Sequence, residues 1–86
     1  MSVEYYKKKL VDLRADVAKE KEAKKRDNER YGDFIKNASS PSTKAAYRKR
    51  KIDHAAAHDR KIENLKREIE RCKETLARER ERAKRK

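Results

Sequence analysis

Apolar residues at heptad spacing occupy two stretches of this chain, and this spacing limits what the chain can fold into. In the first stretch they stand three, four and seven residues apart: Val3, Tyr6, Leu10, Leu13 and Val17. This is the a and d pattern of a coiled coil, which places all of these side chains on a single stripe of a helix. Farther along the same frame the stripe becomes polar, and aromatic residues return at Tyr31 and Phe34. We predict one helix over residues 3–36.

The second stretch lies nearer the C-terminus and repeats in steps of three, four and seven: Ile62, Leu65, Ile69, Cys72, Leu76 and Ala83. Upstream of it Tyr47 and Ile52 keep one side apolar, but the phase of the pattern slips near Asp59. Such a slip is typical of a stutter, a local change in the heptad repeat. We predict a second helix over residues 41–82 and a frayed basic tail over residues 83–86.

The break between the two helices is the segment 37–43, with the sequence Asn-Ala-Ser-Ser-Pro-Ser-Thr. Ser40 can accept a hydrogen bond from the first amides of the second helix, and Pro41 suits the first helical position, where its missing N–H is not needed. Thr43 stands where a capping box would have Glu, so the box is incomplete. We predict a turn at this Ser/Pro segment.

Folding the helices back on each other gives a defined register. Facing residue numbers sum to about 80–82, because antiparallel helices share a rise of about 1.5 Å per residue. Leu13 then faces Ile69, and Leu10 faces Cys72. Because the apolar residues match along both helices, we predict an all-α fold, a two-helix antiparallel coiled-coil hairpin. We define its seam as Val3, Tyr6, Leu10, Leu13, Val17, Phe34, Ile35, Tyr47, Ile52, Ile62, Leu65, Ile69, Cys72 and Leu76.

The balance of charged and apolar residues indicates how such a hairpin becomes stable. The chain has 86 residues, of which 51% are charged and 34% are hydrophobic, so the apolar residues can line a seam but cannot fill a compact core. A lone hairpin of this kind is marginal, and we expect self-association into a larger helical bundle. Cys72, the single cysteine, is expected to be a small buried seam residue.

No stretch of the sequence has the length and hydrophobicity of a membrane-spanning helix or of a secretory signal. We therefore expect a cytoplasmic protein without a membrane partner. The sequence also contains no Gly-rich phosphate loop and no arrangement of nucleophile and base that points to catalysis. We expect a protein that is not an enzyme and needs no cofactor.

A polar layer interrupts the seam, with Glu20, Lys24 and Asp27 facing His54 and His58. The two histidines are four residues apart on one helix face, and with Asp27 they could hold a divalent metal such as zinc. The pair alone is a weak signal, and we favour packing of the polar layer over metal binding. A response to pH is a further interpretation, because histidine titrates near neutrality.

Positive charge gathers in the second half of the chain. The formal net charge is +12: residues 1–38 carry 11 basic and 8 acidic groups, and residues 39–86 carry 17 and 8. Basic residues that could contact phosphates are Arg48, Lys49, Arg50, Lys51, Arg78, Arg80, Arg82, Lys84 and Arg85. Glu79 and Glu81 interleave with the last of these and would repel a nucleic acid. The alternative function is therefore a small basic protein that binds nucleic acid non-specifically through its second helix and tail.

Three segments carry a resemblance to a known family: Tyr5–Leu10, the turn Ser39–Lys44, and Arg60–Leu65 in a Lys/Arg-rich helix. Together they resemble the N-terminal coiled-coil region of bacterial TIR-domain proteins, in which a helical hairpin precedes a TIR domain that cleaves nicotinamide dinucleotides or signals in phage defence. The TIR domain itself is absent from these residues, so no catalytic residue carries over. The resemblance implies an assembly module that forms homo-oligomers and serves an attached effector domain or another protein.

Overall fold

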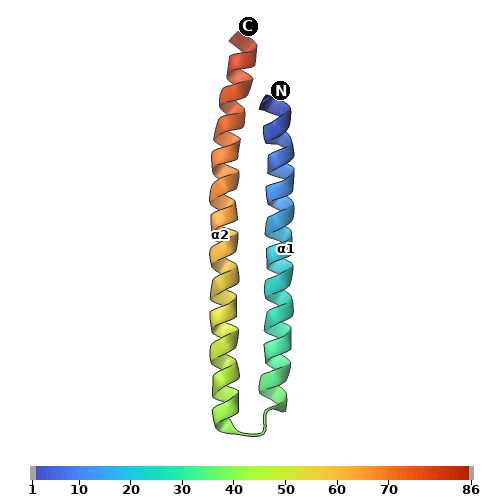
Figure 1. The fold of residues 1–86 in the computed structure, drawn as a ribbon, viewed down its shortest axis with the longest axis vertical. Helices are drawn as coiled ribbons and strands as arrows, with labels where there is room; N and C mark the ends of the chain where they lie inside the picture. The colour runs from blue at the N-terminus through green and yellow to red at the C-terminus, as the bar shows by residue number, and fades with distance from the viewer. Residues whose placement is uncertain (1, 86) are drawn as a thin grey trace.

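The computed structural model of the chain describes residues 2–85, which form two long antiparallel helices (Figure 1). Helix α1 runs from Ser2 to Asn37 and helix α2 from Pro41 to Arg85. The rod they form measures 70 × 14 × 11 Å between Cα atoms. Both chain ends lie at the same end of the rod, where α2 projects beyond α1. The predicted all-α helical hairpin is confirmed.

The turn forms as its residues predict. The Ser40 Oγ accepts a hydrogen bond from the backbone N–H of Thr43 at 3.2 Å, and the Ser40 carbonyl accepts from the N–H of Lys44 at 3.0 Å. Pro41 is the first residue of α2, where a fixed φ and a missing N–H cost nothing. Thr43 cannot complete a capping box as Glu would, and its hydroxyl instead accepts from the Ser40 hydroxyl at 2.7 Å. Ser40 is therefore the N-cap of α2.

Both helices are longer than predicted. Helix α1 extends by one residue at each end, and α2 continues to Arg85 instead of fraying from residue 83. The last turn of α2 carries Arg82, Lys84 and Arg85, which favour the negative end of the helix dipole. Arg85 also pairs with Glu81 at 3.8 Å, one turn earlier. The prediction for Lys86 lies outside the described residues.

The core of the hairpin is the predicted seam near the open end of the rod. Leu10, Leu13, Cys72 and Leu76 are buried together, and four partly buried residues pack against them: Val3, Tyr6, Leu65 and Ile69. The Cys72 thiol donates a hydrogen bond to the Tyr6 carbonyl at 3.4 Å. Leu13 and Ile69 thus lie in one cluster, as the predicted register requires.

Nearer the turn, aromatic rings replace the aliphatic residues. The rings of Phe34 and Tyr47 have centroids 5.2 Å apart, and Tyr31 meets Phe34 edge-on at 5.8 Å. Phe34 nevertheless stays 42% exposed. Two helices alone do not close over this end of the seam.

Ile52 was wrongly assigned to the seam, because its side chain is 68% exposed. In this part of α2, the residues on the side of α1 include Tyr47, His54, His58 and Ile62, spaced by seven, four and four. Two consecutive steps of four are a stutter, which explains the slip in phase that the sequence indicates near Asp59. Ile52 lies off this stripe, since each residue turns the helix by about 100°.

Candidate functional site

Charged side chains from both helices meet in the middle of the rod, where the seam is polar. Glu20 and Asp27 are seven residues apart on one face of α1, and His58 of α2 lies between them. All three side chains are less than one quarter exposed. His58 lies on the seam at this height because it stands four residues before Ile62 and seven before Leu65, in the same heptad frame. The polar layer that the sequence predicts is therefore a set of direct contacts between the helices.

Both ring nitrogens of His58 contact a carboxylate. Nδ1 lies against Glu20 Oε1, and Nε2 is 2.6 Å from Asp27 Oδ2. A carboxylate accepts hydrogen bonds and does not donate them, so this geometry is satisfied in full only when both nitrogens carry a proton. His58 is accordingly an imidazolium held between two carboxylates, whose combined negative charge exceeds its own positive charge.

The same contacts shift two titrations. The hydrogen bond to Asp27, followed by that to Glu20, raises the pKa of His58 above its ordinary value of 6.5, and desolvation opposes this shift without reversing it. The hydrogen bond from His58 lowers the pKa of Asp27 below 3.8, with further help from the charges of Arg30 and His54. The imidazolium–carboxylate state is therefore favoured over both neutral alternatives.

The sign of the resulting pH dependence follows from linkage. A raised pKa for His58 stabilises the fold fully below pH 6.5, and this contribution is lost as pH rises through the folded-state pKa. A lowered pKa for Asp27 stabilises the fold above pH 3.8, and this contribution is lost as pH falls through its folded-state value. The polar layer therefore stabilises the hairpin best in a window between these limits.

Further polar side chains surround this centre. Tyr31, a buried residue of α1, shares a hydrogen bond with His54 Nε2 at 3.2 Å, and His54 Nδ1 is 3.6 Å from Asp27 Oδ2. Arg30 also reaches Asp27, at 3.4 Å. The sequence places Tyr31 in the heptad frame of Val17, two heptads later, and its burial adds it to the seam, from whose predicted set it was left out.

The weak metal candidates Asp27, His54 and His58 do come together, but as partners in ion pairs and hydrogen bonds. Across residues 2–85 no group of three or more His, Cys, Asp or Glu side chains is placed to hold a metal ion. Two carboxylates occupy both nitrogens of His58, which leaves no nitrogen lone pair directed at a shared point. The chemistry of this layer is that of a proton-dependent contact between the helices.

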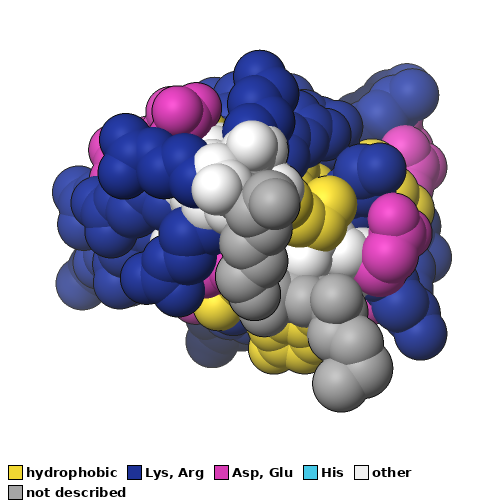
Figure 2. Space-filling view, turned by 90° about the horizontal axis from the view of Figure 1, so that it is seen from above, with side chains coloured by type: hydrophobic (Ala, Val, Ile, Leu, Met, Phe, Trp, Pro, Cys, Tyr) yellow, Lys and Arg dark blue, Asp and Glu magenta, His cyan; other side chains and the backbone are white. Residues whose placement is uncertain are grey.

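The predicted phosphate contacts form two separate groups. Arg48, Lys49 and Arg50 are exposed near the turn, and Lys51 is partly buried. The remaining group is exposed at the far end of α2: Arg78, Arg80, Arg82, Lys84 and Arg85. Viewed along the rod from that far end, Lys and Arg side chains occupy much of the outline, with acidic and hydrophobic side chains between them (Figure 2). Glutamates of the same helix pair with two of them, since Arg82 lies 3.3 Å from Glu79 and Arg85 lies near Glu81.

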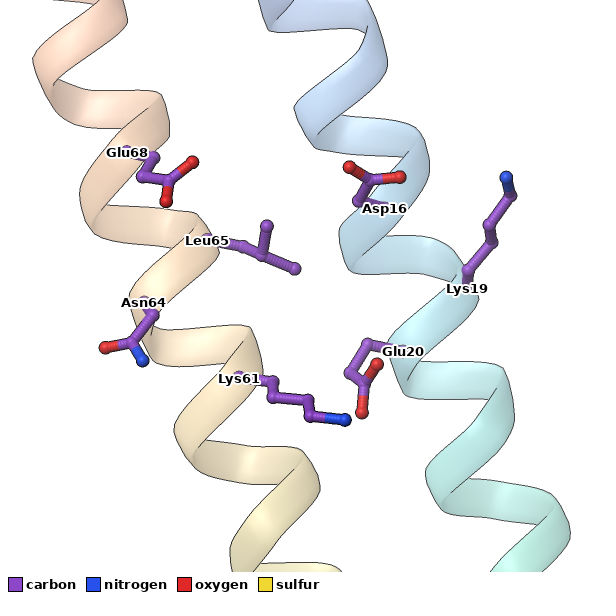
Figure 3. Close-up of a pocket in the computed structure, with 7 residues that line it drawn as sticks. All are labelled: Asp16, Lys19, Glu20, Lys61, Asn64, Leu65 and Glu68. Carbon is purple, nitrogen blue, oxygen red and sulfur yellow. The ribbon is translucent and has the colours of Figure 1, made fainter.

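Open grooves run beside the seam, and the sequence did not indicate them. One of about 450 Å³ lies next to the polar layer and is lined by Asp16, Lys19, Glu20, Lys61, Asn64, Leu65 and Glu68. In Figure 3 the Leu65 side chain points into the space between the helices, and Lys61 extends across it toward Glu20. Charges of both signs therefore meet on this side of the hairpin.

Neither helix contains an apolar stretch of the length that a membrane-spanning segment needs, over the residues that the structure describes. Comparisons of the chain with protein-family models, with curated proteins and with solved structures find no match.

Proposed function

We propose that this chain is a non-catalytic helical interaction module that self-associates through apolar side chains left exposed by the hairpin. The observation that carries the proposal is incomplete burial. Large apolar side chains remain exposed along the rod, namely Tyr5, Val11, Phe34 and Ile52, and Val11 is 64% exposed. Half the seam residues of the core cluster are only partly buried. Further helices packed beside the seam would remove this surface from water.

Electrostatics gives this proposal a distinctive signature. A chain of net charge +12 repels its own copies, and added salt screens that repulsion without weakening apolar contacts. Self-association should therefore strengthen as salt is raised. Binding to a polyanion shows the opposite trend, because it depends on the release of counterions.

Sedimentation equilibrium at low and high salt tests the proposal over micromolar concentrations. We expect oligomers whose population rises with salt. Ile52→Ser should shift the equilibrium toward monomer, because it removes exposed apolar surface and leaves the seam intact. Ala46→Ser, on an exposed position of the same helix, is the matched control and should change little. A monomer at every concentration and salt would overturn self-association.

The resemblance to TIR-associated coiled coils supports a more specific form of the proposal. In that form the module gathers attached bacterial TIR effector domains, and raises their local concentration as it assembles. The coding sequence on either side of these residues, and in the neighbouring genes, tests it. A TIR domain there would support this form, and an unrelated effector domain would contradict it while leaving the interaction module in place.

Nucleic-acid binding is the second candidate, favoured by the exposed basic residues near the turn, Arg48 and Lys49 among them. Fluorescence polarisation with a labelled DNA duplex at about 50 and 200 mM salt measures it. If these residues carry functional binding, the double variant Arg48→Gln/Lys49→Gln should weaken the affinity for DNA. It should also lower the slope of log affinity against log salt concentration by about two. An absence of binding at the lower salt would remove this candidate.

A further inference from the structure

A second groove, on the other flank of the seam, has an unusual lining. It has a volume of about 480 Å³ and lies between α1 and α2 near the open end of the rod. Its apolar lining residues are Leu10, Val11, Leu76 and Ala77, and its charged ones are Lys7, Arg14, Lys73 and Arg80. Among the described residues that line it, all four charges are positive.

The heptad frame explains why these cations face one another. With Leu10 at an a position of α1, Lys7 and Arg14 occupy e positions. With Leu76 at an a position of α2, Lys73 and Arg80 occupy e positions as well. In an antiparallel pair the e positions of the two helices share one flank. Like charges therefore face each other at positions where a coiled coil that needs no further partner would have opposite charges.

The opposite flank of the seam shows that the clustering of cations does not follow simply from the net charge of the chain. There the g positions hold Lys9 and Asp16 on α1, and Lys61 and Glu68 on α2. The groove of Figure 3 lies on that flank and is lined by both acidic and basic side chains. Only the e flank near the open end is purely cationic, so its charge is a local feature of the sequence.

The hairpin itself compensates these cations poorly. Lys7 pairs with Glu4 at 3.5 Å and Lys73 with Glu70 at 3.3 Å, but all four side chains are about half exposed or more. Such surface pairs contribute little, typically about 0–1 kcal/mol. Within residues 2–85 no ion pair is formed by Arg14 or Arg80. Two guanidinium groups thus flank an apolar strip with their charge available to a partner.

We infer that this groove docks an acidic amphipathic helix of a partner protein. The apolar face of such a helix would cover Val11, Ala77 and the edges of Leu10 and Leu76. Its carboxylates would reach Arg14 and Arg80, which can bind them through two parallel hydrogen bonds. A nucleic acid fits less well, because the base of the groove is aliphatic and offers no ring on which a base could stack. The inference rests on the proposed role as an interaction module, but not on self-association.

The probe for this inference is a fluorescein-labelled peptide of about three heptads, with Leu at its a and d positions and Glu at e and g. Fluorescence polarisation measures its binding to the full chain. We expect Arg14→Glu/Arg80→Glu to weaken binding by about tenfold or more. Arg48→Glu/Arg60→Glu changes the net charge equally at exposed positions outside the groove, and should weaken binding by about twofold or less.

A second pair of variants tests the apolar part of the groove. Val11→Ser should weaken peptide binding by about fivefold, because it removes contact surface and adds a hydroxyl. Ile52→Ser, which is equally exposed but outside the groove, should leave binding unchanged. Since both side chains are more than 60% exposed, neither change should unfold the hairpin. Circular dichroism of each variant checks this directly.

The inference would be overturned if the peptide did not bind the wild-type chain, or if the two charge-reversal variants lost equal affinity. It would also be overturned if binding of a DNA oligomer depended on Arg14 and Arg80 while binding of the peptide did not. Sedimentation of the same samples separates this inference from the proposed function. A monomeric chain that binds the peptide in its groove would refute self-association and support the docking site. An oligomer that does not bind the peptide would support self-association and refute the docking site.

Discussion

Replacement of Leu13 by alanine should remove a large share of the stability of the hairpin. Leu13 is 6% exposed and belongs to the cluster formed by Leu10, Cys72 and Leu76. Leu→Ala changes in protein cores cost about 2–5 kcal/mol, and the cost grows with the cavity that remains. Because the seam of two helices is open on both flanks, neighbouring side chains and water can fill part of the space. We therefore expect about 2–3 kcal/mol, at the lower end of that range.

This loss of free energy is large relative to the total stability of the hairpin. At about 0.05–0.15 kcal/mol per residue, a chain of this length has roughly 4–13 kcal/mol of stability, and a fold with one narrow seam belongs near the lower value. The midpoint of thermal unfolding should fall by about 10–20 °C, since 1 kcal/mol corresponds to about 4–8 °C in a domain of this size. Leu13→Ala should thus be partly unfolded at physiological temperature.

Urea unfolding followed by far-UV circular dichroism measures the change, with Val11→Ala as the matched control. Val11 lies on the same helix but is 64% exposed, so its truncation should change the free energy of unfolding by less than about 0.5 kcal/mol. Equal losses in the two variants, or a loss below about 0.5 kcal/mol for Leu13→Ala, would refute the reasoning that intramolecular seam burial stabilises the fold.

Two other predictions concern the polar layer and the turn. The thermal midpoint should fall as pH rises from about 6 to 9, because deprotonation of His58 removes its contribution once pH passes the raised pKa. His58→Gln should flatten this profile, and an unchanged profile would show that other groups set the pH dependence. Ser40→Ala should cost about 1 kcal/mol in urea unfolding, because it removes the N-cap of α2. Ser42→Ala, at the neighbouring exposed position, should cost much less, and equal effects would contradict the assignment of the cap.

Much of the fold could be predicted because it depends on features that sequence spacing records directly. Heptad positions place Leu13 and Ile69 on facing stripes, and the Ser40–Pro41 pair marks where α2 begins. Helix ends were harder, since α2 continues through a highly charged segment to Arg85. There i, i+4 pairing and the helix dipole compensate for the lack of apolar contacts.

The polar layer could be predicted only in outline. Facing positions brought Glu20 and Asp27 near His58, but the contact of one imidazole with both carboxylates depends on side-chain rotamers, which the spacing does not record. Ile52 lies off the contact stripe in the heptad frame of Ile62 and Leu65, although its apolar side chain suggested otherwise. The cationic groove escaped prediction because it arises from e positions of both helices, which come together only once the register is known.

The return of α1 on α2 within one molecule is the claim on which the fold, the polar layer and the groove all depend. Double electron–electron resonance between spin labels on Lys8→Cys and Glu74→Cys tests this claim most directly. Cys72→Ser removes the native thiol. Dilution with unlabelled chain isolates the intramolecular distance. Two adjacent helices should give a separation of about 20–35 Å, including the labels. A single uninterrupted rod would separate the labels by roughly 100 Å, and the absence of the short intramolecular distance would contradict the hairpin.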